Sequence, residues 1–208
     1  MSLTDQAYSL IKHKIITCEF SPGQPLIEQD LINQLQLGRT PIHQAIHRLA
    51  QEGMLTILPR KGVLVTPISL NQIIDIIEVR VANEVLCASL AVEHATKEDI
   101  AQMNDIINQT EYYLSQQNTE ELMKLDLQFH KAISTAAKNK ILAELLERLH
   151  EMQARFWFIT LSDQQHSENI YHEHLRILKA IKNRDLSEAT NAIRAHINNF
   201  KHSIIQSI

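Results

Sequence analysis

The stretch from Leu26 to Val65 constrains the fold of this 208-residue chain more than any other part of it. Apolar residues recur at helical spacing on both sides of Gly38, and the glycine interrupts the period. The pattern therefore predicts two helices joined by a tight turn. Their apolar faces are expected to be Leu26, Leu31 and Leu35 before the turn and Ile42, Ala45, Ile46 and Leu49 after it.

The second of these helices is predicted to begin near Arg39 and to end near Glu52-Gly53. Thr40 is the expected N-cap, and Pro41 fits the first turn, where its missing N–H costs nothing. Because the apolar face is used by the core, polar side chains such as His47 are left for solvent or a partner. Donors of this kind suit the major groove of DNA. The predicted DNA contacts from this helix are Arg39, Thr40, His43, Gln44 and Arg48.

A basic hairpin is predicted directly after the two helices. Residues 54–58 and 62–66 are β-prone, and the tip between them contains Arg60, Lys61 and Gly62. A helix-turn-helix followed by such a hairpin is a winged helix, in which the second helix reads base edges and the wing contacts phosphate or the minor groove. The tip residues therefore join the predicted DNA-binding set. The alternative is a small helical module whose charged side chains are merely solvated.

The same residues resemble the GntR family of bacterial transcription regulators over residues 4–67. The family's recognition helix typically opens Ser-Arg-Thr-Pro-Val-Arg-Glu-Ala-Leu, and this chain has Gly38-Arg39-Thr40-Pro41-Ile42-His43-Gln44-Ala45-Ile46. The resemblance implies that Arg39 contacts a base or phosphate and that Gly62 lets the wing backbone approach DNA. The second family arginine is His43 here, which carries at most a partial charge near neutral pH. Further matching motifs are Pro22-Gly23-Gln24-Pro25-Leu26, Arg48-Leu49, Glu52-Gly53-Met54-Leu55 and Arg60-Lys61-Gly62.

Helical periodicity takes over after the short breaker Thr66-Pro67-Ile68-Ser69. We therefore expect two domains, a winged helix-turn-helix in residues 1–67 and an all-α domain in residues 68–208. Short connections between the expected helices favour an antiparallel bundle, so the fold class is mainly α with a small β-hairpin wing. The six helices are predicted at residues 69–95, 97–116, 119–137, 140–161, 163–182 and 185–206, with Thr96, Thr119 and Asp185 as caps.

Composition and charge indicate where the protein is located and whether it binds DNA as a single copy. A hydrophobic content of 44% is ample for a buried core, and no apolar run is long enough to span a bilayer. We expect a cytoplasmic protein with no membrane partner, in which Cys18 and Cys87 are reduced thiols. Residues 1–68 carry 6 Lys/Arg and 5 Asp/Glu, a net charge of only +1. One copy should therefore bind DNA weakly, and we expect a homodimer.

Asp126 and His130 lie four residues apart, so one face of a helix can present a carboxylate and an imidazole to one ion. His174 and His196 each lie within an apolar helical pattern that could aim them inward. An aspartate and a histidine four residues apart, taken alone, are more often structural. The alternative interpretation is therefore that these histidines are buried and paired with carboxylates, without a metal.

The carboxy-terminal pattern resembles the FCD subfamily of GntR regulators, whose helical domain holds a divalent metal. The matching motifs are Glu78-Val79-Arg80, Asp126-x-x-Phe129-His130, Glu173-His174-x-x-Ile177-x-x-Ala180-Ile181, Asp185-x-x-x-Ala189 and His196-Ile197. The resemblance implies that the metal ligands are Asp126, His130, His174 and His196. One oxygen and three nitrogens suit zinc or nickel and leave coordination positions for water or a carboxylate effector.

The same resemblance implies effector contacts from three further residues. Arg80 matches an arginine that faces the pocket, where its guanidinium would hold a carboxylate; the alternative is a salt bridge to Glu84 at i+4. Asn139 matches an asparagine at a helix junction, where capping is the alternative. Arg155 is expected in the pocket wall with Trp157, although a tryptophan is more often part of the core.

We therefore expect a sequence-specific, DNA-binding transcription regulator, not an enzyme, that binds an operator in double-stranded DNA. A repressor controlled by a small organic acid bound at the metal is the leading interpretation. A metal-dependent hydrolase is the runner-up, because a three-histidine site can activate water. The sequence contains no His-Glu-x-x-His motif and no second carboxylate at the spacing of a general base. Both absences argue against a hydrolase. A third interpretation makes the metal purely structural, with the bundle serving as a dimer scaffold.

Overall fold

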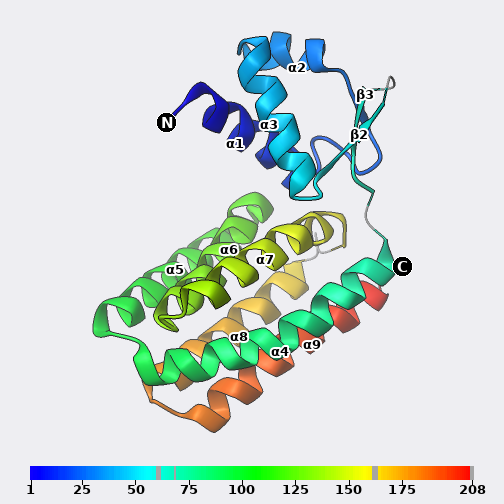
Figure 1. The fold of residues 1–208 in the computed structure, drawn as a ribbon. Helices are drawn as coiled ribbons and strands as arrows, with labels where there is room; N and C mark the ends of the chain where they lie inside the picture. The colour runs from blue at the N-terminus through cyan, green and yellow to red at the C-terminus, as the bar shows by residue number, and fades with distance from the viewer. Residues whose placement is uncertain (60–61, 68, 161–163, 207–208) are drawn as a thin grey trace. The chain divides into compact units, whose positions relative to one another are not determined.

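The computed structural model describes residues 1–59, 62–67, 69–160 and 164–206. The chain divides into two compact units, residues 1–69 and residues 70–208. The first unit holds three helices and a small antiparallel sheet, and the second unit is helical throughout its described part (Figure 1). The predicted fold class, a winged helix-turn-helix followed by an all-α domain, is confirmed.

The helices of the first unit are α1 (Leu3–Ile16), α2 (Glu28–Leu35) and α3 (Arg39–Gln51). Helix α1 packs against α3, and Ile11 and Leu49 are both fully buried in the shared core. The N-cap of α3 is Gly38, so the expectation that Thr40 caps this helix is wrong. Thr40 already lies in the first turn, because the extended backbone at Gly38 starts the helix one residue before Thr40.

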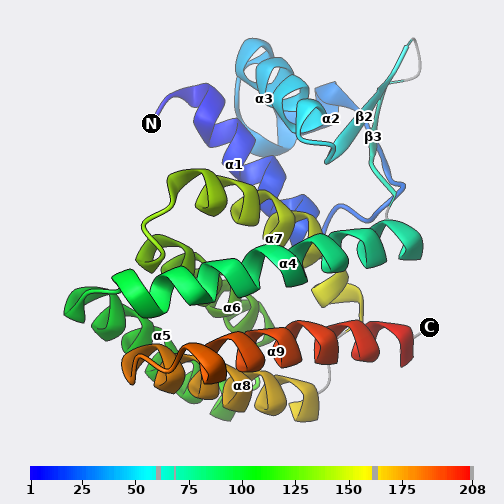
Figure 2. The same cartoon turned by 60° about the horizontal axis from the view of Figure 1, so that its bottom comes forward.

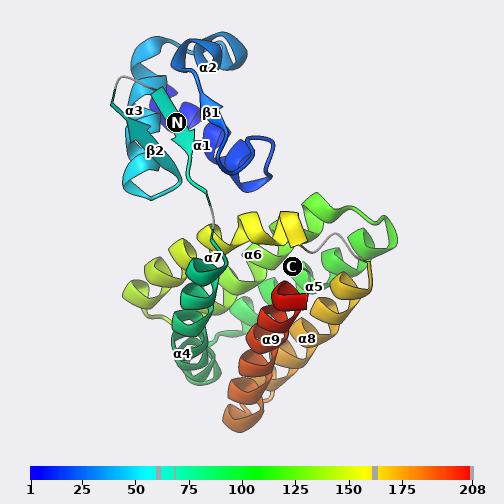
Figure 3. The same cartoon turned by 90° about the vertical axis from the view of Figure 1, so that its right-hand side faces the viewer.

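The sheet contains β1 (Pro25–Leu26), β2 (Leu55–Leu58) and β3 (Gly62–Val65) in the order β1-β3-β2 (Figure 3). Strands β2 and β3 form the predicted hairpin. The sequence patterns did not indicate β1, and the assignment of Leu26 to a helix is wrong, since Leu26 pairs with Val63 in the sheet. A two-residue strand that opens with proline leaves no alternation to detect.

The second unit contains six helices within its described residues, as predicted. They are α4 (Leu70–His94), α5 (Lys97–Ser115), α6 (Thr119–Ala136), α7 (Lys140–Thr160), α8 (Gln164–Lys182) and α9 (Leu186–Gln206). Helices α4 and α9 lie side by side and run in opposite directions (Figures 1 and 2). Helix α5 packs on α6 and α8, while α6 packs on α7 and α8 packs on α9. This arrangement encloses the inward faces of α4, α6, α8 and α9.

Local capping sets where several of these helices begin. Thr96 forms a reciprocal capping box with Asp99 before α5, as expected. Asp185 accepts a hydrogen bond from the backbone N–H of Glu188 at the start of α9. Asn118 caps α6, so the expected cap Thr119 is wrong by one residue. No helix in the described part of the chain has the length and apolar character needed to cross a bilayer.

Adjacent leucines on α7 give a matched test of the bundle core. Leu146 is completely buried, whereas Leu145 is 40% exposed. We expect Leu146→Ala to lower the free energy of unfolding by about 2–5 kcal/mol, because it leaves a cavity. Leu145→Ala should change it by less than about 1 kcal/mol. Urea unfolding followed by far-UV circular dichroism measures both, and equal losses would contradict the packing of α7.

Candidate metal centre and nucleic-acid interface

The structure brings the four predicted metal ligands together inside the bundle. Asp126 and His130 lie one turn apart on α6, His174 lies on α8 and His196 lies on α9. One ligand atom from each residue lies within 4.8 Å of every other. The three imidazoles are between 2% and 5% exposed, and Asp126 is half-buried. Residues separated by up to 70 positions in sequence thus offer donors to a common point.

The inward atoms of this cluster are the Nε2 nitrogens. His130 Nε2 lies 3.2 Å from His196 Nε2, and His174 Nε2 lies 3.4 Å from Asp126 Oδ1. His174 Nε2 is buried yet makes no hydrogen bond within the described part of the chain. A buried polar atom is almost always satisfied, so this nitrogen points to a missing ligand. Burial beside two other imidazoles also holds the pKa of His174 well below its ordinary value, which keeps the ring neutral.

Two carboxylates fix the tautomers of these rings. Glu84 Oε2 lies 2.9 Å from His130 Nδ1, and Glu173 Oε2 lies 2.7 Å from His196 Nδ1. An ionised carboxylate only accepts hydrogen bonds, so the hydrogen bond to Glu173 places the hydrogen of His196 on Nδ1. His130 Nδ1 lacks hydrogen-bond geometry toward Glu84, but the negative charge at 2.9 Å favours a hydrogen there as well, which leaves both Nε2 atoms with lone pairs. Two lone pairs 3.2 Å apart repel each other unless a cation lies between them. Carboxylates behind imidazoles are also the usual outer shell of a metal site, so the residues present fit a divalent ion.

Glu84 is the centre of a buried network that sequence analysis did not identify as part of the site. Its Oε1 accepts from Arg80 Nε at 2.6 Å and lies 2.9 Å from His150 Nε2. Burial opposes ionisation of Glu84, but Arg80 and the two neighbouring imidazoles hold the pKa of its carboxyl well below its ordinary value. Burial lowers the pKa of His150 to about 4, so this ring is neutral near pH 7. Glu84 thus stays charged in the core and keeps His130 oriented.

Helical spacing offered a signal for His150. His150 follows Leu142 and Leu146 at intervals of four on the buried face of α7. Glu84 and His150 also form, with His130, a second group whose ligand atoms could hold an ion. The guanidinium of Arg80 lies against this second group and disfavours a cation there. The group containing Asp126 is therefore the better metal centre.

The three predicted effector residues differ in their surroundings. Arg80 is 2% exposed and adopts the alternative arrangement, an ion pair with Glu84, with a further hydrogen bond to Gln153. Asn139 is exposed and accepts a hydrogen bond from the Leu142 N–H, so it caps the start of α7. Arg155 is 3% exposed on α7.

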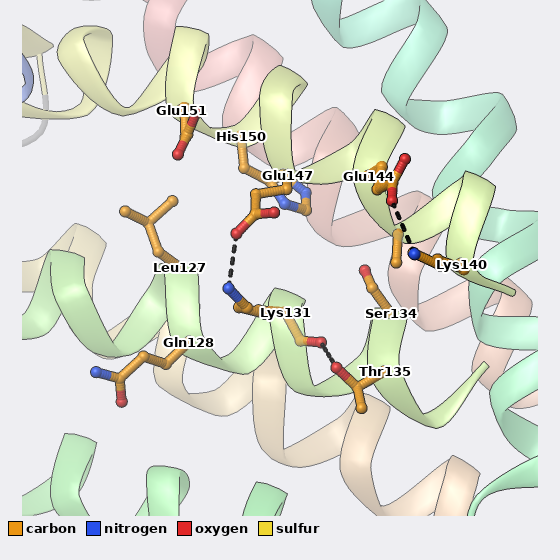
Figure 4. Close-up of a pocket in the computed structure, with 11 residues that line it drawn as sticks. Leu127, Gln128, Lys131, Ser134, Thr135, Lys140, Glu144, Glu147, His150 and Glu151 are labelled. Atoms are coloured by element: carbon orange, nitrogen blue, oxygen red, sulfur yellow. Dashed lines mark hydrogen bonds and ion pairs between the residues drawn. The ribbon is translucent and has the colours of Figure 1, made fainter. Parts of the chain in front are cut away.

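Three cavities reach residues of the buried network. A cavity of about 10 Å³ lies beside Asp126 and His174, and this volume has room for roughly one water molecule. A larger cavity of about 280 Å³ lies between α6 and α7 and has His150 in its lining. Figure 4 shows the ion pair between Lys131 and Glu147 that joins the two helices at this cavity. A third cavity, of about 510 Å³, lies between α8 and α9 and has His196 and Glu173 in its lining. The space next to the donors is therefore small beside Asp126 and His174 but large beside His196.

The exposed face of α3 is the candidate nucleic-acid interface. Arg39, Thr40, His43 and His47 are all exposed, and the Arg39 side chain is 86% accessible. Glu28 on α2 lies behind this face, with its carboxylate 3.5 Å from Arg39 Nε and 3.3 Å from His43 Nδ1. Glu28 thus holds Arg39 and His43 in place, and both side chains remain accessible to a partner.

Two other predicted DNA contacts are held by α1 instead. Gln44 accepts a hydrogen bond from the Thr4 hydroxyl. The Arg48 guanidinium lies 3.7 Å from the ring centroid of Tyr8 and forms ion pairs with Asp5 and Glu52, each at 3.5 Å. The groups best placed for base contact are therefore in the first half of the exposed face.

The predicted wing tip is only partly described. Arg60 and Lys61 lie outside the described residues, so their contacts with DNA remain predictions. Gly62 opens β3 with φ +99°, and a Cβ there would lie 3.6 Å from the Leu26 carbonyl. A side chain at this position would be strained, which explains the glycine in terms of backbone conformation.

Comparison with known proteins decides the family. Residues 3–65 match the family model of bacterial regulatory proteins of the gntR family, and residues 75–199 match the FCD domain. The chain belongs to the GntR family, FCD subfamily. It is a DNA-binding transcription regulator. The candidate recognition helix lies within the first match, and the four clustered ligands lie within the second.

Relatives of this GntR regulator align along most of its length. The HTH-type transcriptional repressor RspR of Escherichia coli (strain K12) is 24% identical over 204 residues, covering 98% of this chain and 90% of the relative. The Nta operon transcriptional regulator of Aminobacter aminovorans is 28% identical over 193 residues, covering 93% of this chain and 90% of the relative. The E. coli McbR/YncC structure shares the fold with a TM-score of 0.89 at 22% identity, covering 99% and 98% of the two chains.

Arg39→Ala tests the proposed DNA-contacting face of α3. We expect operator affinity to fall by about 1–3 kcal/mol and base preference to relax, as for a lost contact with a base edge. Arg194→Ala, which removes an exposed arginine from α9, is the control and should leave binding unchanged. Electrophoretic shift titrations on a duplex selected by the wild-type protein measure both. Wild-type affinity in Arg39→Ala would contradict the assigned interface.

His43→Arg tests the departure from the family pattern. We expect tighter DNA binding at neutral pH and a salt slope steeper by about one, because arginine carries a permanent charge at this position. His202→Arg adds the same charge at an exposed position of α9 and serves as the matched control. Salt-dependent titrations distinguish the two; no gain for His43→Arg would mean that the imidazole makes a contact of its own.

Proposed function

We propose that this GntR-family regulator is a homodimeric repressor controlled by a divalent metal, zinc or nickel, and a small carboxylate effector. The observation that best supports the metal is the convergence of Nε2 atoms around a buried, unsatisfied His174 Nε2. When bound, the metal would supply a Lewis-acidic coordination position for a carboxylate oxygen. The residues proposed to hold it are Asp126, His130, His174 and His196.

The outer residues of this site have a positioning role in the proposal. Glu173 accepts the Nδ1 hydrogen of His196, and Asn199 Nδ2 donates to Glu173 Oε1 at 2.6 Å. The Glu84 carboxylate lies 2.9 Å from His130 Nδ1 and attracts a hydrogen to that nitrogen. These contacts keep the Nε2 lone pairs aimed inward before any ligand arrives. Preorganisation of this kind raises metal affinity, because little order has to be imposed on binding.

We propose that the effector reaches the site through the small cavity beside Asp126 and His174. Its other walls include Thr110 and Leu122 from α5 and α6, and Ile170 from α8. Because about one water fills this cavity, a carboxylate that enters on this side requires α8 to shift away from the other two helices. A ligand that binds only the shifted arrangement changes the population of bundle conformations.

We propose that a shift of α8 is transmitted to the DNA-binding unit through α4, which follows that unit in the chain. Helix α8 packs against both α9 and α4, and the first residue of α4, Leu70, directly follows the unit that ends at Ser69. A change at α8 can therefore alter how two winged helices of a dimer are presented to two operator half-sites. A role for Arg80 in effector binding stays a prediction, and it would require the guanidinium to leave Glu84.

Repression by a dimer is proposed on two grounds. The first unit carries little net positive charge, so a single copy gains little from counterion release. Two copies bound to adjacent half-sites combine their affinities. The relative RspR is itself named a transcriptional repressor, which supports the same sign of regulation here.

The metal is tested first by elemental analysis of two variants on α8. His174→Ala should lose most of the bound metal, because one of three buried nitrogen ligands is removed. His172→Ala removes an exposed histidine from the same helix and should keep one metal per chain. Stoichiometric metal in His174→Ala would show that the ligand set is wrong.

The effector is tested by calorimetric titration of organic acids into metal-loaded and chelator-treated protein. We expect carboxylate binding only in the metal-loaded form, with release from a selected operator duplex at the same concentrations. Equal carboxylate affinity in both forms would refute the effector mechanism. Metal-dependent thermal stability without any carboxylate binding would support a structural metal instead.

A further inference from the structure

Two exposed histidines occur four residues apart on the recognition helix. The rings of His43 and His47 meet edge to face with their centroids 4.5 Å apart, and the His43 side chain is 57% exposed. Histidines at positions i and i+4 lie on one helix face, which is the spacing by which helices offer two imidazoles to one metal ion. This pair lies in the first unit, whereas the buried metal centre is formed by helices of the second.

A carboxylate behind the pair fixes the state of one ring. His43 Nδ1 lies 3.3 Å from Glu28 Oε2, and the carboxylate can only accept. In the neutral ring the hydrogen therefore lies on His43 Nδ1, and Nε2 presents a lone pair. Arg39 Nε lies 3.5 Å from the other carboxylate oxygen, Glu28 Oε1, and helps to hold it in place. A carboxylate bonded to the far nitrogen of an imidazole is the arrangement that orients histidine ligands in metal sites.

We propose that His43 and His47 form a second, exposed site for a divalent transition-metal ion on the DNA-reading face of α3. Each histidine contributes one nitrogen, Glu28 is a positioning residue, and water completes the coordination. Imidazole ligands favour copper, zinc and nickel over magnesium or calcium. With two exposed ligands, this site binds more weakly than the buried centre and exchanges its ion readily.

Binding at this site competes with DNA. This step rests on the role proposed for α3 in contacting the operator. An ion held by both imidazoles removes their nitrogens from base edges and places its water shell where the bases must approach. Linkage then requires that DNA weaken the metal by the same factor by which the metal weakens DNA. Free zinc would in this way lower operator occupancy without reaching the helical domain.

The site is tested by zinc titration of full-length protein that already holds one zinc per chain. Calorimetry should show a second, weaker event that is lost in His47→Gln and weakened about 10–100-fold in Glu28→Gln. His13→Gln is the matched control, because this exposed histidine on α1 has Ser9 and Thr17 four residues to either side. Long-range nitrogen–proton spectra should assign the second event to the rings of His43 and His47.

Two results would overturn the site: absence of a second event, or its persistence with wild-type affinity in His47→Gln. Binding to a duplex selected from a random pool by the wild-type protein tests the competition. Excess zinc should weaken wild-type binding and leave His47→Gln unaffected; equal responses would refute the competition. His174→Ala should retain the second event, so failure of the buried centre is distinguishable from failure of this site.

Discussion

The bundle depends on an electrostatic constraint at its centre. Glu173 holds a hydrogen on Nδ1 of His196, and the Glu84 carboxylate, 2.9 Å from His130 Nδ1, favours a hydrogen on that atom; two Nε2 lone pairs then face each other at 3.2 Å. Such an arrangement is unfavourable in a low-dielectric interior unless positive charge lies between the nitrogens. The buried Nε2 of His174 has no hydrogen-bond partner in the described part of the chain and would also be satisfied by a cation. A cation at this point would therefore satisfy several buried groups together.

That constraint connects helices that are distant in sequence. Glu84 on α4 contacts His130 on α6 and His150 on α7, and Glu173 on α8 contacts His196 on α9. Glu84 is buried, whereas Glu173 is half-buried. A buried carboxylate is costly unless it is paired, so the contacts of Glu84 are also a condition for stable packing. The same groups that orient ligands thus hold five of the bundle's helices in register. A metal bound at the proposed site would therefore be linked to helix packing.

Sequence patterns predicted the elements with strong periodicity and missed those defined by tertiary contacts. The bundle helices and the β2–β3 hairpin followed from apolar spacing and turn residues. Strand β1 has only two residues and depends on pairing with β3, so no local pattern marks it. Glu84 and His150 are 66 positions apart, and only the fold brings them to His130. The sequence offered both a ligand contact and the i+4 pair with Glu84 for Arg80; the second hydrogen bond, to Gln153, depends on the packing of α4 against α7.

The central claim is that carboxylates set the tautomers of the buried histidines so that their Nε2 atoms bind an ion. Long-range nitrogen–proton NMR of zinc-loaded protein, labelled with nitrogen-15 at histidine, measures this directly. The structure predicts a protonated Nδ1 and a metal-shifted Nε2 for His130 and His196, and a metal-shifted Nε2 for His174. Protonated Nε2 atoms in these rings, or signals that zinc leaves unchanged, would contradict the account.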